Sequence, residues 1–354
     1  MIPLDQARGI IRRGVSAVLI ATAIVPATAL DRSTPSLAAV KDFFYVLQMD
    51  KLSLAALANS RFDLLVMDYA RYGDADSEFT PAQVASIKAG GTSGSPKIVL
   101  AYMSIGEAED YRFYWDESWK PGSPAWLGPQ NPDWGGNYKV RYWMSGWQSL
   151  ILGVRSGQGK SYLDRIIDQG FDGVYLDIID AYQYWSGEGG PHERTRLQAR
   201  KDMASFVKRI RTYARVQRGK TGFLVFPQNG ADIVWNNADA LDAVGRDYLA
   251  ACDGLGQEDI WYDEVSPQPA DSVLWTLKAL EVFRSKGKKI LSIDYVWDPA
   301  RAFSSANVAR FNDYYAKALA KGLIPYAGNR SRALRDIVTV KKERGFLYAQ
   351  PRVR

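Results

Sequence analysis

The chain has 354 residues, of which 47% are hydrophobic and 12% aromatic, and its formal net charge is +6. Its one cysteine excludes an internal disulfide, and its one histidine excludes a histidine-rich metal centre. The apolar content supplies a large core, and a chain of this length fits a single domain because α/β barrels routinely exceed 250 residues.

The N-terminus has the pattern of an export signal. Three arginines lie within the first 13 residues, and the apolar run VSAVLIATAIV (15–25) that follows is too short to span a bilayer. The small residues ATA (27–29) are typical of a cleavage site. We therefore expect a signal peptide at 1–29, a single domain at 30–354, and a periplasmic or secreted protein without stable membrane insertion. The alternative is an uncleaved membrane anchor.

The remaining basic residues are spread along helical segments. Removing residues 1–29 takes away three arginines and Asp5 and leaves a net charge of +4. The Lys and Arg side chains of 199–220 and 284–289 are better explained as a solvated helix surface than as a nucleic-acid site. We expect a monomer that uses no cofactor, no metal and no nucleic acid.

A helix that ends at a glycine and is followed by a strand recurs four times along the chain. Glycine supplies the left-handed position after a last helical turn, so this rhythm indicates βα units and a mostly parallel sheet. Eight strands are predicted: Phe43–Gln48, Phe62–Asp68, Lys97–Tyr102, Gly173–Asp177, Phe223–Gln228, Asp253–Glu258, Lys289–Asp294 and Leu323–Tyr326. Eight parallel strands predict a (β/α)₈ TIM barrel. A doubly wound open sheet is the alternative, but no G-x-G-x-x-G loop follows the first strand.

The segment from about Ala108 to Gln148 is long for a loop and rich in tryptophan, glycine and proline. It predicts an elaborated third βα loop, with a short strand at KVRYW, and loops of this length are usually functional. Its tryptophans could present platforms to sugar rings or could cap the barrel as core.

Polar side chains end nearly every predicted strand. These positions are Gln48, Asp68, the segment Tyr102–Glu107, Asp177, Asn229, Glu258, Asp294 and Asn329. A single acid at a strand end is most often a helix cap, but several acids around one rim indicate a shared cleft, because barrel active sites lie at the C-terminal strand ends. His192 lies in a Gly/Pro-rich loop and Cys252 precedes a strand, where packing is the simpler role. Carboxylates are therefore the main chemical resource, and two of them flanking a bond are the apparatus of glycoside hydrolysis.

Several segments resemble glycoside hydrolase family 114, the endo-α-1,4-polygalactosaminidases. They are VMDYARYG (66–73), LAYMSIGEAEDYR (100–112), NPDWGGNYKVRYW (131–143), GFDGVYLDIIDAY (170–182), FPQNGADI (226–233), DGLGQEDIWY (253–262), SIDYV (292–296) and GLIPYAGNR (322–330). The resemblance covers roughly residues 40–335. It implies a (β/α)₈ barrel, hydrolysis of partly deacetylated α-1,4-galactosaminogalactan, and two catalytic acids that by motif are Asp177 and Glu258.

We expect Asp177 to be the nucleophile and Glu258 the acid/base of a retaining, endo-acting mechanism. A short strand would hold Asp177 rigidly, and aromatic burial beside Asp259 would raise the pKa of Glu258. Substrate contacts are expected from Asp68, Tyr102, Glu107, Asp180, Tyr182, Asn229, Trp261 and Asp294.

Acids on the rim would attract an ammonium-bearing sugar. Pairing of these acids with Arg71, Arg112 or Arg246 is the alternative. A non-catalytic glycan-binding barrel and a glycosidase for a different glycan also remain open.

Overall fold

The computed structural model describes residues 36–50, 52–60, 62–90, 96–153 and 159–335, which belong to one compact unit. The predicted signal peptide lies outside the described residues, so it stays a prediction. Along the described ranges, no helix combines the length and apolarity needed to cross a membrane.

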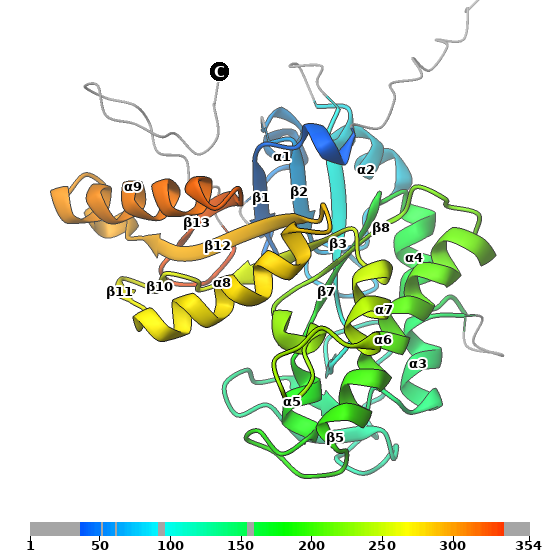
Figure 1. The fold of residues 1–354 in the computed structure, drawn as a ribbon. Coiled ribbons are helices and arrows are strands. Elements are labelled where there is room, and N and C mark those ends of the chain that lie inside the picture. Colours follow the sequence, from blue (N-terminus) through cyan, green and yellow to red (C-terminus); the bar gives the residue numbers. More distant parts are fainter. Residues whose placement is uncertain (1–35, 51, 61, 91–95, 154–158, 336–354) are drawn as a thin grey trace, which may run out of the picture. The chain divides into compact units, whose positions relative to one another are not determined.

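Eight parallel strands form the centre of the molecule (Figure 1). They are β1 (Phe43–Val46), β2 (Leu64–Met67), β3 (Ile98–Ser104), β7 (Gly173–Asp177), β8 (Leu224–Pro227), β9 (Gly254–Glu258), β12 (Lys289–Trp297) and β13 (Ile324–Asn329). Every predicted strand is present, and β3, β12 and β13 run two to three residues beyond the predicted ends. The strands read as nearly continuous buried runs, as parallel strands covered on both faces do.

The strands are arranged as a (β/α)₈ TIM barrel. Strands β1-β2-β3-β7-β8 form one sheet and β9-β12-β13 another, and a parallel bridge from Gln228 to Gly256 connects the two. Between β13 and β1, the described residues form no strand ladder. There Tyr326 packs against Phe43 and Phe44, each with a ring-centroid distance of 5.7 Å. Aromatic packing thus joins the two strands at this seam.

Tyrosine side chains fill the barrel interior. The rings of Tyr45 and Tyr175 lie 5.3 Å apart, and the Tyr45 hydroxyl donates to Gln228 Oε1 at 3.2 Å. Gly256 makes room for them, because a Cβ at this position would lie 1.7 Å from the Tyr175 hydroxyl oxygen. The barrel is therefore a packed core that leaves its polar groups at the strand ends.

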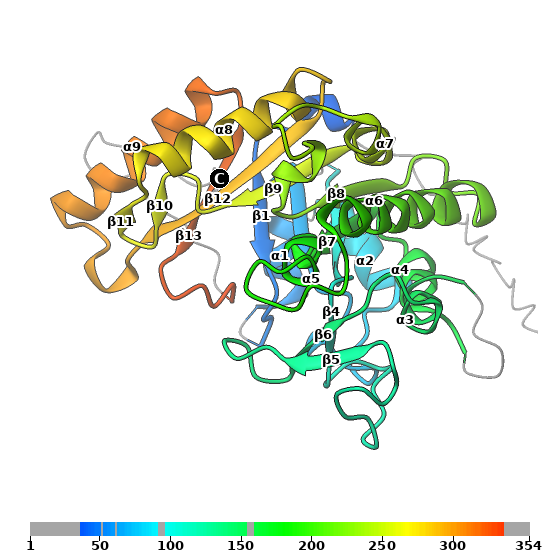
Figure 2. The ribbon, with the colours of Figure 1, turned by 60° about the horizontal axis from the view of Figure 1, so that its bottom comes forward.

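Helices alternate with the strands, as the glycine-to-strand rhythm predicts. They are α1 (Leu54–Asn59), α2 (Pro81–Lys88), α3 (Ser145–Ile151), α4 (Tyr162–Gln169), α5 (Ala181–Trp185), α6 (Arg196–Thr212), α7 (Ala243–Ala251), α8 (Ala270–Arg284) and α9 (Ser305–Ala320). Gly170 ends α4 in the left-handed conformation, with φ 86°. Helix α6 packs against α5 and α7 (Figure 2), and it continues into an unpredicted π-helical turn at Tyr213–Gln217.

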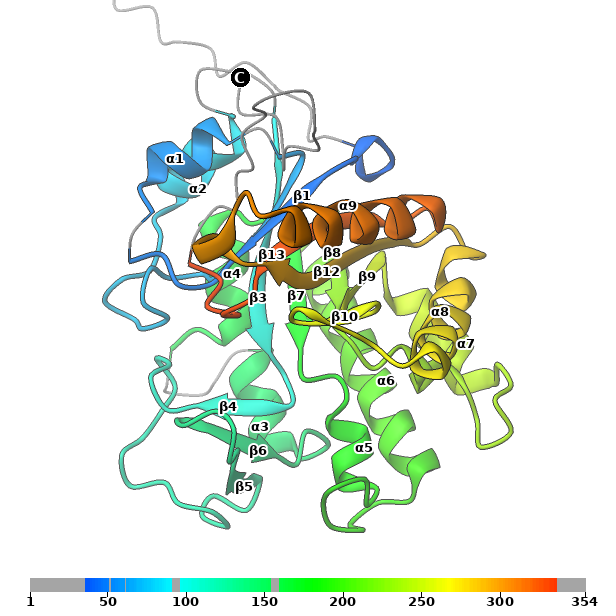
Figure 3. The same ribbon diagram turned by 90° about the vertical axis from the view of Figure 1, so that its left-hand side faces the viewer.

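The third βα loop is elaborated, as predicted. It contains a small antiparallel sheet of β4 (Glu107–Glu109), β6 (Asn137–Val140) and β5 (Leu127–Gln130), which follows the end of β3 (Figure 3). The predicted strand at KVRYW is the end of β6. Trp126 and Trp147 are buried with ring centroids 5.2 Å apart, whereas Trp134 is 58% exposed. Some of the loop's tryptophans are therefore core, as the alternative interpretation expected.

Candidate active site

Asp177 and Glu258, the two predicted catalytic acids, each occupy the last position of a barrel strand. Asp177 ends β7 and Glu258 ends β9, and only β8 lies between these strands in the barrel order. Parallel strands end at the same rim, so the barrel brings together two carboxylates 81 positions apart in the sequence.

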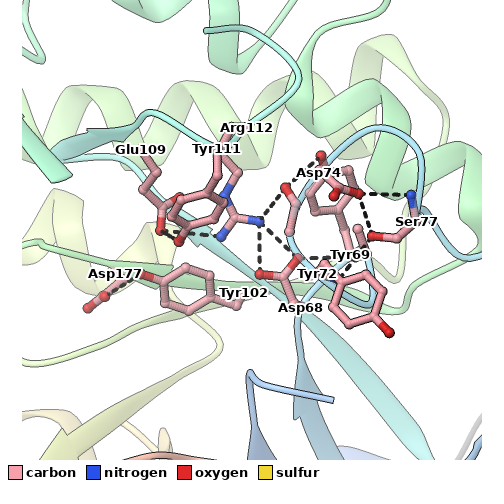
Figure 4. Close-up of polar contacts among 12 residues, drawn as sticks. Asp68, Tyr69, Tyr72, Asp74, Ser77, Tyr102, Glu109, Tyr111, Arg112 and Asp177 are labelled. Carbon is pink, nitrogen blue, oxygen red and sulfur yellow. Dashed lines mark hydrogen bonds and ion pairs between the residues drawn. The ribbon is translucent and has the colours of Figure 1, made fainter. Parts of the chain in front are cut away.

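Asp177 is held by a hydrogen bond from the neighbouring strand. The Tyr102 hydroxyl donates to Asp177 Oδ2 at 2.7 Å (Figure 4). Burial raises the pKa of Asp177 to about 8, and the negative charge of Glu258 adds to the rise. The following residue, Ile178, has φ 58°, a conformation that a β-branched residue rarely adopts. Tyr102, predicted as a substrate contact, is thus the residue that orients the candidate nucleophile.

Glu258 is held by two side chains from other strands or loops. Asn229 Nδ2 donates to Glu258 Oε2 at 3.0 Å, and the Tyr295 hydroxyl donates to Oε1. Asn229 Oδ1 also accepts from the Glu258 backbone N–H at 3.0 Å and from Gln257 Nε2 at 3.2 Å. Asn229 can do this because its backbone is left-handed, with φ 58°, a region that asparagine tolerates. Both oxygens of Glu258 therefore have fixed donors.

A cavity of about 250 Å³ opens beside Glu258. Four carboxylates line it, and Lys and Arg side chains are absent from the described residues that form its wall. These residues are Asp180, Gln183, Asn229, Gly230, Ala231, Asp232, Gln257, Glu258, Asp259, Trp275, Thr276 and Ala279. Burial raises the pKa of Asp180 to about 6, with Lys139 opposing the rise and Glu107 adding to it. The cavity wall is therefore rich in negative charge.

Other predicted substrate contacts have partners inside the protein. Asp68 pairs with Arg112 at 2.8 Å, and Arg112 Nε pairs with Glu109 at 2.6 Å (Figure 4). Glu107 is buried and pairs with Lys139 Nζ at 2.5 Å. For Asp68, the alternative of pairing with Arg112 is thus confirmed. Neither carboxylate lies open on the rim as predicted, because each neutralises a cation of the third loop.

Asp294 has a structural task at the end of the sixth βα unit. Its two oxygens accept backbone N–H groups of Ile260, Trp261 and Tyr262 at 2.8–3.0 Å, and it is fully buried. Burial raises its pKa to about 7 against these three donors. Asp294 therefore shapes the turn after Glu258.

Two predicted aromatic contacts are buried. Trp261 is 6% exposed, and Tyr182 is fully buried, with its hydroxyl 3.3 Å from Gln183 Nε2. Direct contact of either side chain with substrate stays a prediction.

Sequence reasoning missed Tyr295 and Trp275. Tyr295 follows Asp294 directly, and the alternation of side chains along a strand sends the two to opposite faces, so SIDYV carried a signal for a second inward group. Trp275 lies in the helical segment LWTLKALEVF, and nothing in that pattern distinguishes a helix residue that reaches the rim.

The remaining reactive side chains lie outside the site. His192 is exposed in its loop. Cys252 is fully buried, its thiol donates to the Tyr248 carbonyl at 3.1 Å, and burial raises its pKa, which confirms the packing role. Within the described ranges, no group of three or more His, Cys, Asp or Glu side chains is arranged to hold a metal ion.

Comparison with known proteins agrees with this site. The model of glycoside-hydrolase family GH114 matches residues 27–343. An uncharacterized protein of Methanocaldococcus jannaschii is 35% identical over 84% of this chain and 78% of its own length. Another uncharacterized protein, from Thermotoga maritima, is 35% identical over 84% of each chain.

Among solved structures, an α-galactosidase from Thermus thermophilus has a TM-score of 0.42 at 11% identity, over 85% of this chain and 60% of its own. A Bacillus subtilis mannanase has a TM-score of 0.41 at 14% identity, over 84% and 82%. Because the family model spans nearly the whole barrel, including both rim carboxylates, the chain belongs to glycoside-hydrolase family GH114 and is a glycoside hydrolase.

Proposed function

We propose that the protein cleaves α-1,4-linked galactosamine-containing polysaccharide at internal bonds. The observation that carries the substrate class is the acidic cavity beside Glu258, lined by Asp180, Asp232 and Asp259. A partly deacetylated amino sugar carries an ammonium group, and a cleft lined by one sign of charge attracts the opposite sign even when the whole protein is basic. A neutral glycan would gain nothing from this arrangement.

The proposed mechanism is a double displacement by two carboxylates. Glu258 donates a proton to the glycosidic oxygen while Asp177 attacks the anomeric carbon, and a covalent glycosyl–enzyme forms as the leaving chain departs. Glu258 then takes a proton from water, which displaces Asp177 and restores the original anomeric configuration. Tyr102 supports the attack because it fixes one oxygen of Asp177.

The raised pKa of Asp177 fits this mechanism when the substrate is cationic. The sequence predicts a raised pKa at Glu258, whereas the structure raises that of Asp177 to about 8, so a nucleophilic Asp177 must lose a proton near neutral pH. An ammonium group on the carbon next to the anomeric centre lies close to the attacking carboxylate and favours its ionised form. Substrate and nucleophile would then activate one another.

Product analysis after digestion of purified, partly deacetylated galactosaminogalactan tests the proposal. We expect a series of galactosamine-containing oligosaccharides, which indicates internal cleavage. NMR during the reaction should show the α-anomer as the first product, and a β-anomer appearing first would defeat retention.

Two alternatives share the same panel of polysaccharides. Tight binding without release of reducing ends would indicate a glycan-binding barrel. Turnover of a neutral glycan at a higher kcat/KM than of the amino-sugar polymer would reject the proposed substrate.

We also propose export of a monomer, on the strength of the N-terminal pattern in residues 1–29. Cell fractionation of the full chain and of a variant lacking these residues tests export. Retention of both in the cytoplasm would contradict it.

A further inference from the structure

Trp275 is an exposed aromatic side chain on the wall of the acidic cavity. It lies in the second turn of α8, is 45% exposed, and lines the cavity together with Glu258 and Asp259. Exposed tryptophan is costly to keep in water, because its large apolar surface gains free energy when it is buried. At the edge of a sugar-cleaving site, such a surface is suited to packing against the apolar face of a sugar ring.

The ring of Trp275 is held in place by a buried neighbour. The rings of Trp235 and Trp275 lie 5.7 Å apart at an interplanar angle of 79°. Trp235 is 4% exposed, ends the short helix Ala231–Val234 and carries the Lys278 ammonium 4.9 Å from its ring centroid. An edge-to-face contact with an immobile partner restricts the rotation of Trp275, so its surface is preorganised and little entropy is lost on binding.

The position of the cavity indicates which part of the substrate this surface meets. Of the two candidate catalytic carboxylates, Glu258 lines the cavity and Asp177 does not. In the proposed mechanism, Glu258 protonates the oxygen of the leaving group, so the cavity lies on the leaving-group side of the cleaved bond. This step rests on the proposed function, because it uses the acid/base role of Glu258.

We propose that Trp275 is the platform of a leaving-group subsite, which binds a 2-amino sugar of the polymer on the reducing-end side of the cleaved bond. The indole packs against the sugar ring, and its π face attracts an ammonium group through a cation–π interaction. The carboxylates of Asp232 and Asp259 on the same wall add attraction for that charge, although each already pairs with one arginine, Arg196 and Arg332 respectively. The subsite therefore selects a long substrate over a short one.

Two substrates separate this subsite from the chemistry. Partly deacetylated galactosaminogalactan fills the leaving-group side, whereas α-galactosaminyl fluoride has a one-atom leaving group and leaves that side empty. For Trp275→Ala, the ratio of kcat/KM on the polymer to kcat/KM on the fluoride should fall about 10-fold, which corresponds to about 1.4 kcal/mol. Trp275→Phe should recover part of the ratio, because an aromatic face remains.

Leu274→Ala is the matched control. Leu274 is adjacent on α8 and 65% exposed, but it lines a different groove, between α8 and α9. Its substitution should leave both kcat/KM values unchanged. An unchanged ratio for Trp275→Ala, or an equal loss on both substrates, would overturn the subsite. If wild-type protein hydrolyses neither substrate, the proposed function fails and this assignment fails with it, an outcome distinct from the previous two.

Discussion

At the scale of single residues, the site depends on carboxylates that different neighbours hold and charge differently. We expect Asp177→Asn and Glu258→Gln each to lower kcat/KM on the amino-sugar polymer by about 10³-fold or more, because each amide keeps the shape and loses the nucleophilic or proton-transfer role. Reducing-end release measures this. Glu281→Gln, an exposed acid on α8 paired with Arg284, is the control and should leave kcat/KM unchanged. Near wild-type turnover in either site variant would refute the assignment.

Asp177 also predicts a pH dependence of stability. Its pKa is about 8 in the folded protein and about 3.9 in an unfolded chain, so the folded state holds a proton that the unfolded state releases between these values. The contribution of Asp177 to stability is thus complete below about pH 4 and is lost as the pH rises to 8. Asp177→Asn has no such loss, and at pH 9 it should be more stable than wild type by about 2 kcal/mol or more.

Thermal unfolding of both proteins from pH 5 to pH 9 measures that difference. Other titrating groups are common to both proteins, so the gap in Tm isolates Asp177. A gap that stays constant or narrows as the pH rises would contradict the raised pKa.

At the scale of elements, a buried ion cluster ties the third loop to the barrel. Arg112 of the loop bridges Asp68 after β2 and Glu109 of β4, and its guanidinium lies 5.7 Å from the Tyr102 ring centroid. Arg112→Met should reduce the free energy of unfolding by about 3–5 kcal/mol, since it leaves two buried carboxylates without their cation.

Urea denaturation measures this loss. Arg284→Met, which breaks an ion pair exposed by about half at both partners, should leave the denaturation midpoint unchanged. Equal effects of the two substitutions would show that the buried cluster does not hold the loop.

At the scale of the whole molecule, a basic protein carries an acidic cavity. The formal net charge is +6, yet the cavity beside Glu258 is lined by four carboxylates. We expect kcat/KM on the deacetylated polymer to fall several-fold as salt rises from about 0.05 to 0.5 M, because salt screens the attraction between cavity and ammonium groups. Fully N-acetylated polymer should show little salt dependence. Tighter binding of the acetylated polymer would argue against electrostatic recognition.

The eight strands could be predicted because their signals are local. A glycine that ends a helix and the apolar run that follows it are neighbours in the sequence, and eight such runs closely limit the topology. The positions of Asp177 and Glu258 at the rim followed from the same pattern. The roles of Asp68 and Asp294 did not, because their partners lie 44 and 32–34 residues away. Those partners come within reach only when the barrel folds.

The sequence by itself determined the strands, the glycine stops, the rim that carries the acids and, through its motifs, the family. Only the tertiary structure decided what each acid does. Burial gives Asp177 the raised pKa, backbone donors take up both oxygens of Asp294, and Arg112 neutralises Asp68. The physical reason is that hydrophobic periodicity acts between near neighbours, whereas the ionisation and partners of a carboxyl group depend on every charge and dipole that folding brings within a few ångströms.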